Sequence, residues 1–439
     1  DGINVMINGT CIPFPTVRPE IKNGRTMVPL AGTLEYLGAT VSYDQTNHTA
    51  SISFGDLSFS HAIGSCVLTC GDGEQIAMDA ASYVKDGRTM VPLAFFAQAL
   101  DYEIYWDNTY ETAVLLNRQE TVDQIDSQFT LVNRILYDLV GGDQRKAGKS
   151  LNSTLNLDLA ITLLDSLNGN KTYSAKLSGS ALTNDKAGHL QYTANLEQLL
   201  DLYLAFSSND DLSQADQAEI AHIRSLLSNV TVDVILDLES QCLYVRSPLL
   251  PELGLVEHAN TWASLPLDSL LDASDPSFSG PSVGQLLVSG CFANAYSPFS
   301  AWSDITSVTQ EAAAYVGDDC FTKSGSSYTV KMDMADLLSS DSDETFQAVL
   351  TVSPSGDKDC TYALSVSAED PDGTFVLKVS GSSGKTDLDA TLHLKNMLKA
   401  VLELETRMAA SSQQPLTQPP AGDTIEYPAG RLGVGQLDE

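Results

Sequence analysis

Apolar and polar residues alternate along most of the chain between about residues 150 and 410. One clear run is Leu155, Leu157, Leu159, Ile161 and Leu163, with Asn156 and Asp158 between them. This alternation predicts β-strands with one apolar and one solvated face. It recurs in about eleven segments separated by short turns rich in Gly, Ser and Asp, which is typical of an antiparallel meander.

The alternating positions define a candidate surface for an apolar ligand. Residues two apart on a strand point to the same side, so we expect these side chains to share one face of the sheet. The residues selected come from five predicted strands and one tryptophan-containing segment: Leu157, Leu159, Ile161, Val232, Val234, Leu236, Trp262, Phe375, Leu377, Leu392 and Leu402.

Helical periodicity interrupts the strands in two places, at residues 196–228 and 281–316. A broad sheet with one apolar face must cover that face, and these helices are the candidates for its concave side. A further apolar stripe runs through residues 121–140 and ends before Gly141-Gly142. It predicts a connector helix within residues 119–144 that docks on the following domain.

The first 118 residues contain an internal repeat. Residues 21–31 read IKNGRTMVPLA and residues 84–94 read VKDGRTMVPLA, an offset of 84 − 21 = 63. Asn-Gly and Asp-Gly are hairpin-turn dipeptides, and the proline suits the first turn of a helix. Each copy therefore predicts a small unit of strand, turn, helix and hairpin. The motif positions with an expected structural role are Gly24, Arg25, Pro29, Gly87, Arg88 and Pro92.

The doubled motif, with an aromatic-Asp turn after each copy, resembles the copper amine oxidase N-terminal domain-like family. That family is a stalk module of secreted or surface proteins of Gram-positive bacteria. The resemblance covers about residues 1–118 and implies contact with the cell wall or a surface protein. The chain departs from the family where Ala31 and Ala94 replace an Arg that usually follows V-P-L.

The later alternation resembles the LolA-like lipoprotein carriers. These are half-barrels of antiparallel strands with helices on the concave side. The segment NTWASLPLD at residues 260–268 is similar to a Trp-containing stretch of related lipoproteins. This resemblance implies a cavity for acyl chains, and hence a lipid or another apolar small molecule as the ligand.

Composition narrows the possible functions. With 24 basic and 57 acidic residues the net charge is −33, which argues against nucleic acid as a partner. No apolar run reaches the length of about 18 residues that a membrane-spanning helix needs. Strong acidity suits an exported protein, and a first residue that is not Met fits either a removed export signal or an omitted N-terminal segment. With the resemblance to the stalk family, this implies a bacterial protein that is secreted or at the cell surface.

Catalytic signatures are missing from the sequence. It contains no G-x-S-x-G, H-E-x-x-H or phosphate-binding loop, and its six histidines are scattered. We therefore expect no catalytic residue, no metal and no cofactor, and a protein that is not an enzyme.

Together these patterns predict an α+β protein. A small duplicated β-α-β module at residues 1–118 and the connector at 119–144 precede an antiparallel half-barrel at 145–411, whose concave face is covered by helices. A Pro-rich tail follows at 412–439. The alternatives are a structural or adhesive surface protein with no small-molecule ligand and, third, an enzyme of unrecognised type.

Overall fold

A computed structural model describes residues 3–94, 99–100, 102–146, 148–165, 169–206, 213–266, 282–295, 297–333, 345–420 and 424–426. The chain divides into two compact units. The first unit is Asp1–Phe129 together with Ser282–Gly317, and the second is Thr130–Pro281 together with Asp318–Glu439. The seven described α-helices and the predominantly antiparallel sheets agree with the predicted mixed fold class.

Three small sheets form the first unit. One has the order β12-β13-β1-β2, with the strands Glu103–Asp107, Thr112–Leu116, Asn4–Ile7 and Thr10–Cys11. The second has the order β10-β11-β4-β3, with the strands Tyr83–Lys85, Arg88–Pro92, Arg25–Pro29 and Glu20–Lys22. The third runs from β5 to β9, with the strands Thr40–Asp44, Thr49–Phe54, Leu57–Ala62, Val67–Cys70 and Gln75–Ala77.

The two GRTMVPL segments lie side by side. Each forms a strand, and β4 pairs antiparallel with β11 so that Val28 is opposite Val91. Helix α1 (Leu30–Tyr36) begins directly after Pro29, whose extended backbone serves as its N-cap. The corresponding residues 95–98 of the second copy lie outside the described residues.

One core holds these sheets together. Val5, Val28, Leu34, Leu68 and Leu115 are each at most 1% exposed and belong to a single buried cluster. These side chains come from all three sheets and from α1, so their burial joins the sheets through their apolar faces.

The helices of residues 282–317 belong to the first unit, which corrects the expectation that they cover the large sheet. Helix α7 (Val283–Asn294) packs on α3 (Arg118–Asp126), and α8 (Pro298–Val316) packs on β12 and β13. Gly284 lets the helices approach closely, because an added Cβ would lie 2.6 Å from the carbonyl oxygen of Val122. The Phe292 ring lies 5.1 Å from that of Tyr105.

The second unit is built on one sheet of 14 strands. Its order is β20-β21-β22-β23-β24-β25-β26-β14-β15-β16-β17-β18-β19-β27. The strands from β20 to β26 are Thr322–Ser324, Ser327–Asp333, Thr345–Pro354, Cys360–Asp370, Gly373–Ser382, Lys385–Leu394 and Leu398–Ser411. Those from β14 to β19 are Ser150–Leu163, Lys171–Thr183, Ala187–Asn195, Val230–Asp237, Cys242–Arg246 and Trp262–Pro266, and β27 is Thr424–Glu426.

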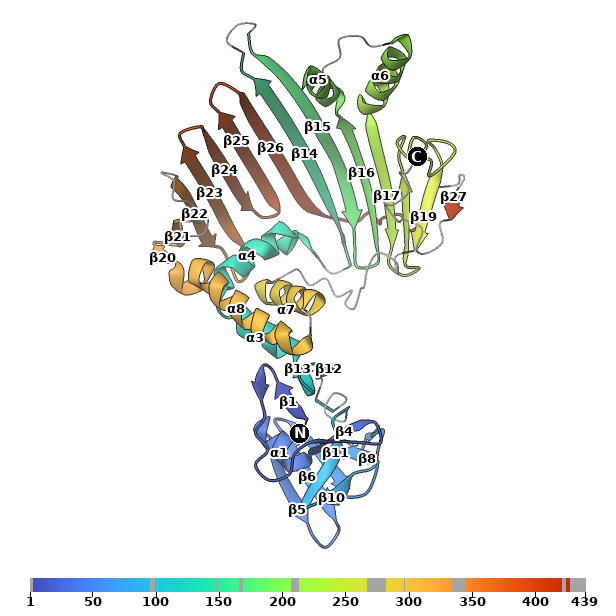
Figure 1. Ribbon diagram of the computed structural model, residues 1–439, viewed down its shortest axis with the longest axis vertical. Coiled ribbons are helices and arrows are strands. Elements are labelled where there is room, and N and C mark those ends of the chain that lie inside the picture. Colours follow the sequence, from blue (N-terminus) through green and yellow to red (C-terminus); the bar gives the residue numbers. More distant parts are fainter. Residues whose placement is uncertain are drawn as a thin grey trace. The chain divides into compact units, whose positions relative to one another are not determined.

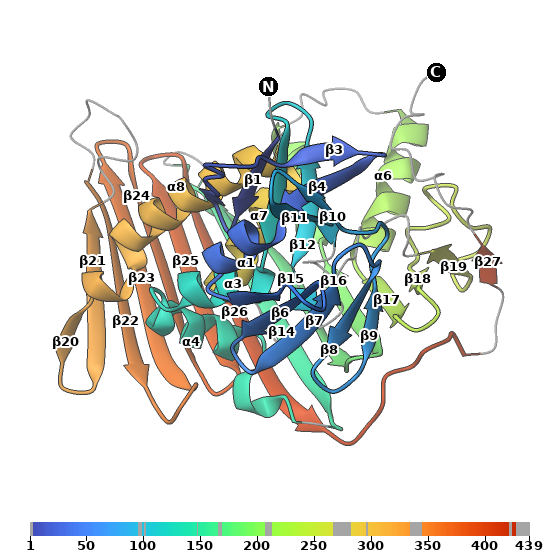
Figure 2. The ribbon, with the colours of Figure 1, turned by 90° about the horizontal axis from the view of Figure 1, so that it is seen from below.

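The sheet is curled into a half-barrel with two separate edges. The N-terminal and C-terminal groups of strands join in the middle of the sheet. There the last long strand, β26, pairs antiparallel with the first, β14, over the whole length of β14. Figure 2 shows β20 and β27 at opposite ends of the sheet. All neighbouring pairs are antiparallel except β19 and β27. Part of the predicted tail therefore extends the sheet, since β27 falls within residues 412–439.

Three helices belong to this unit. They are α4 (Thr130–Leu139), α5 (Glu197–Phe206) and α6 (Gln214–Leu227). Figure 1 shows α4 near one end of the strands and α5 with α6 near the other end. The predicted connector is thus two helices rather than one, because α3 ends at Asp126. Helix α4 starts anew, with the carboxylate of Asp318 accepting hydrogen bonds from the backbone N–H groups of Thr130 and Leu131.

Candidate functional site

One face of the large sheet carries a continuous band of apolar side chains, here called the apolar face. Strand register places the following residues opposite one another in a single row: Val330, Leu350, Leu364, Val379, Leu388, Leu404, Leu157, Leu177, Ala194 and Val230. Residues two positions away on each strand form parallel rows on the same face. The apolar face therefore crosses the sheet without a break in this row.

The predicted ligand contacts divide between the two faces. All of them except Trp262 lie on the apolar face, because Leu157, Leu159 and Ile161 share their rows with the others through β26 and β15 to β17. Trp262 lies on the opposite face, since its neighbour Ala263 is the residue paired with Val245 and thereby with Val234. The sequence did not reveal which parity β19 would take.

Burial of the apolar face is uneven. Val352 and Tyr362 are at most 5% exposed under α4, in a cluster that includes Leu131 of that helix. At the other side Tyr173 is 3% exposed on β15, the strand that α5 contacts. Helices α4 and α5 therefore cover only parts of the face.

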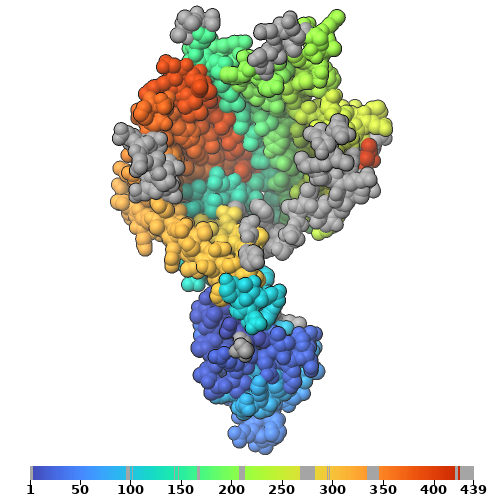
Figure 3. All heavy atoms as spheres, viewed as in Figure 1, coloured from blue at the N-terminus to red at the C-terminus, as the bar shows by residue number. Residues whose placement is uncertain are grey.

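Between these covered parts, large apolar side chains stay partly accessible to solvent. None of the predicted contacts on the apolar face is buried, and Leu392 is 37% exposed. We call this group the open band: Leu157, Leu159, Ile161, Phe375, Leu377, Leu392 and Leu402. In the space-filling view the middle of this unit is hollowed between the orange and green strands (Figure 3). A partly exposed, concave apolar surface is the usual setting of a site for an apolar ligand.

A buried carboxylate lies at the α4 end of the apolar face. Asp138 is 1% exposed, and its Oδ1 accepts a hydrogen bond of 3.0 Å from the backbone N–H of Gly384. Its Oδ2 has no hydrogen-bond partner among the described residues. Burial raises the pKa of Asp138, and the hydrogen bonds from the backbone oppose that effect only in part. Burial also raises the pKa of the neighbouring Cys360 thiol to about 12, so this group is no nucleophile at neutral pH.

The opposite face carries a small polar cluster around Trp262. Asp233 accepts hydrogen bonds from Arg246 at 2.8 Å, and its other oxygen lies 2.9 Å from Nε2 of His189. The guanidinium of Arg246 lies 4.6 Å from the Trp262 ring centre, a cation–π contact. Since Trp262 is 2% exposed, this cluster anchors β16 to β19 rather than offering a surface to a ligand.

The glycines and prolines of the repeat have the same role in both copies, whereas the two arginines differ. Gly24 and Gly87 have φ angles of 73° and 75°, a left-handed conformation that the hairpin turns require. Pro29 and Pro92 end paired strands. Arg25 forms an ion pair with Asp79, whereas Arg88 has no carboxylate partner among the described residues. The sequence motif predicted the turns but not this difference between the two arginines.

These arrangements provide the setting for comparison with known proteins. Residues 6–115 match the family model of the copper amine oxidase N-terminal domain. The match confirms the resemblance predicted from the doubled motif. It covers about a quarter of the chain and names a domain that is non-catalytic in copper amine oxidases. A comparison with curated proteins finds no match.

In the described part of the chain, no group of three or more His, Cys, Asp or Glu residues is arranged so that it could hold a metal ion. One histidine and serine pair is close: Nε2 of His61 lies 2.7 Å from the Ser82 hydroxyl. Both residues are at most 3% exposed, and the contact joins strand β7 to the residue that precedes β10. Among the described helices, none is both long and apolar enough to cross a bilayer.

Proposed function

We propose that this chain is a non-enzymatic, exported protein of the bacterial cell envelope that binds a lipid or another apolar ligand on the open band. The observation that carries the proposal is the partial exposure of large apolar side chains along one face of a curled sheet, in a unit whose middle is hollowed (Figure 3). Each methylene of an acyl chain removed from water there would contribute about 0.8 kcal/mol. The LolA-like resemblance of the alternating segments supports the same ligand class.

The proposed role of the first unit is to position this carrier at the cell surface. Its match to the copper amine oxidase N-terminal domain, together with the resemblance of the doubled motif to a stalk module of surface proteins, supports a contact with the cell wall or a surface protein. Secretion or surface display would be the corresponding localisation.

The decisive experiment compares two neighbouring substitutions in β14. Leu157→Asp puts a charge on the open band, and Asn156→Asp puts the same charge on the solvated face. Binding of a fluorescent fatty acid to the purified protein should be saturable and should weaken at least about tenfold in Leu157→Asp, because a carboxylate there is desolvated by the ligand. Asn156→Asp should bind as the wild type does.

Native mass spectrometry provides the independent measurement. Copurified apolar molecules should be present on the wild type and reduced on Leu157→Asp, while circular dichroism shows that both variants are folded. If the wild type carries no apolar molecule and takes up no fatty acid, the alternative of a structural or adhesive surface protein replaces the proposal.

A further inference from the structure

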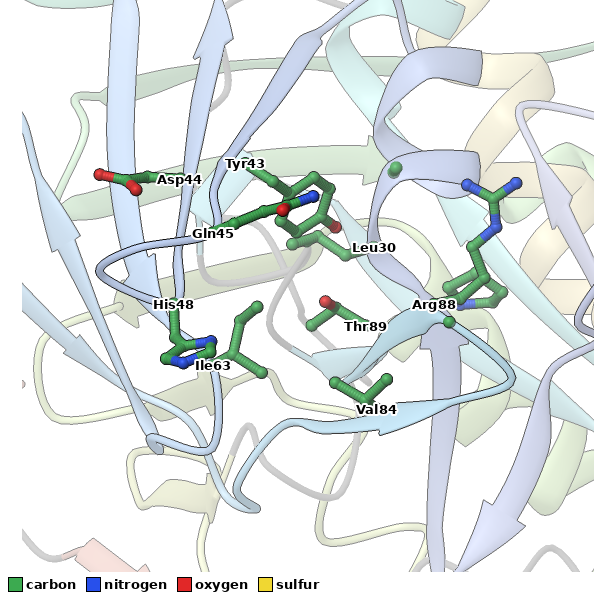
Figure 4. Close-up of a pocket in the computed structure, with 12 residues that line it drawn as sticks. Leu30, Tyr43, Asp44, Gln45, His48, Ile63, Val84, Arg88 and Thr89 are labelled. Carbon is green, nitrogen blue, oxygen red and sulfur yellow. The ribbon is translucent and has the colours of Figure 1, made fainter.

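The first unit contains a pocket that is separate from the open band. Its volume is about 480 Å³, within the range of about 300–1,000 Å³ that is typical of small-ligand sites. Three segments of the repeat region and Ile63 line it: the segments are the start of α1, the turn of residues 43–48, and the hairpin of residues 84–89. Figure 4 shows the residues around this space.

The lining combines an apolar floor with a polar rim. Ile63 and Val84 supply accessible apolar surface, and Val84 is 59% exposed, whereas Leu30 in the lining is only 1% exposed. Tyr43, which is 42% exposed, adds an aromatic ring. In Figure 4 His48 and Arg88 stand on opposite sides of these residues, and the carboxylate of Asp44 points away from them. The pocket thus offers a hydrophobic surface beside a guanidinium.

Arg88 is the residue that defines the ligand chemistry. It has no carboxylate partner among the described residues, although acidic residues outnumber basic ones 57 to 24 in this chain. Its repeat counterpart Arg25 does pair with a carboxylate, that of Asp79. A guanidinium presents a planar set of donors that fits a carboxylate with two parallel hydrogen bonds.

We propose that this pocket binds a small carboxylate with an apolar body, such as the C-terminal residue of a peptide or a free acylated amino acid. Arg88 holds the carboxylate, while Tyr43, Ile63 and Val84 contact the apolar body. The side-chain amide of Gln45 lies on the rim and can bond the ligand's amide group. This site is independent of the ligand proposed for the open band.

Calorimetric and NMR titrations of the full chain test the proposal with three probes: N-acetyl-leucine, N-acetyl-Ala-Leu with a free carboxylate, and the same dipeptide as its amide. Binding of a free carboxylate should shift signals of the pocket residues, and the amide should bind at least about tenfold more weakly. A preference for the dipeptide acid over N-acetyl-leucine identifies a peptide C-terminus as the source, and the reverse identifies a free acid.

Two variants locate the binding. Arg88→Gln should lose about tenfold or more in affinity for the acid, and Ala31→Glu, which places a like charge in the lining, should weaken binding of the acid as well. Arg25→Gln is the matched control: it changes the same residue type at the equivalent repeat position, outside the pocket lining. Equal binding of acid and amide, no binding of any probe at millimolar concentration, or equal losses in the Arg25 and Arg88 variants would overturn the proposal.

Discussion

The two units handle their apolar residues differently. In the first unit, short strands and α1 enclose a core in which Leu34 and Leu115 are at most 1% exposed. In the second, strands of up to 14 residues carry a longer apolar series, yet Leu157 and Leu402 remain partly exposed. Similar residue types thus serve cohesion in one unit and leave a surface available in the other.

This difference in packing predicts where a substitution lowers the stability of the protein most. A close-packed interior loses contacts on all sides when a side chain is shortened, whereas a partly exposed face loses only part of its burial. In the middle of the large sheet, backbone hydrogen bonds join β25, β26 and β14 along their length, while the side chains of the open band are only partly buried. The comparison therefore predicts strong effects in the first unit and weak ones on the open band.

The largest effect is expected from a matched pair of leucine truncations. Leu34→Ala should destabilise the first unit by about 2–5 kcal/mol, because it leaves a cavity in the core. Leu402→Ala should destabilise the second by about 1 kcal/mol or less, because its side chain is partly solvated in the folded state. Hydrogen exchange under increasing urea, followed by mass spectrometry, measures each region separately.

The control for this pair is Asn156→Ala on the solvated side of β14, where the side chain is exposed. It should change the stability of neither unit appreciably. Equal losses from Leu34→Ala and Leu402→Ala would contradict the comparison, since they would show that the open band is packed as tightly as the core.

A smaller change in stability is expected from substituting two buried aspartates, one in each unit. Asp107 accepts hydrogen bonds from the backbone N–H groups of Thr109, Tyr110 and Phe299, at 2.9–3.0 Å. Burial would raise its pKa, but these bonds and one from Ser297 together lower it. Asp107→Asn should therefore cost about 1–3 kcal/mol at pH 7, because one carboxylate acceptor becomes a donor. Urea unfolding measures this loss.

Asp138→Asn is the counterpart in the second unit. It keeps an acceptor for the Gly384 N–H and removes a buried charge, so stability at pH 7 should stay unchanged or rise. The two substitutions should also respond to acid in opposite ways. The stability that wild-type Asp107 contributes is present above pH 3.8 and is lost as the pH falls from 3.8 through the lower folded-state pKa, so the loss in Asp107→Asn should shrink over that interval. The folded-state pKa of Asp138 is raised above 3.8, so the wild type gains stability from this group as the pH falls through that pKa, and any advantage of Asp138→Asn should disappear there. A destabilising Asp138→Asn would show that its charge is needed.

Sequence patterns predicted the strands and turns better than they predicted which elements pack against one another. The period-two alternation indicated the strands of the large sheet, and the repeat indicated the turns at Gly24 and Gly87. The position of α7 and α8 was not predictable, because an apolar helix stripe does not specify which sheet it covers. Their place in the first unit depends on details such as the close approach at Gly284.

The candidate sites show the same limit. Alternation placed the open band on one face, but the side on which Trp262 lies depends on strand register, which the sequence pattern leaves undetermined. The pocket at Arg88 depends on residues that are far apart in the chain, such as Tyr43 and Val84. The two motif arginines differ in their ion pairing among the described residues, and that difference is a property of the fold.

The smallest expected effect is a pH response confined to the first unit. Nδ1 of His61 lies 2.9 Å from the Val67 carbonyl oxygen, which can only accept, so Nδ1 donates and Nε2 accepts from the Ser82 hydroxyl. Burial lowers the pKa of His61 below its ordinary value of 6.5, and the bond to Val67 opposes this in part. The folded unit therefore holds a neutral imidazole.

Protonation consequently favours the unfolded chain. Stability from this group is fully present above pH 6.5 and declines as the pH falls through the interval between 6.5 and the lower folded-state pKa. Hydrogen exchange of the first unit at pH 7.5 and 5.5, corrected for the intrinsic exchange rate, should reveal faster opening at pH 5.5. His61→Gln should remove most of this difference, whereas His48→Gln, at an exposed position, should preserve it. If His61→Gln leaves the pH response unchanged, then other titratable groups cause the faster opening at pH 5.5, and the prediction for His61 is wrong.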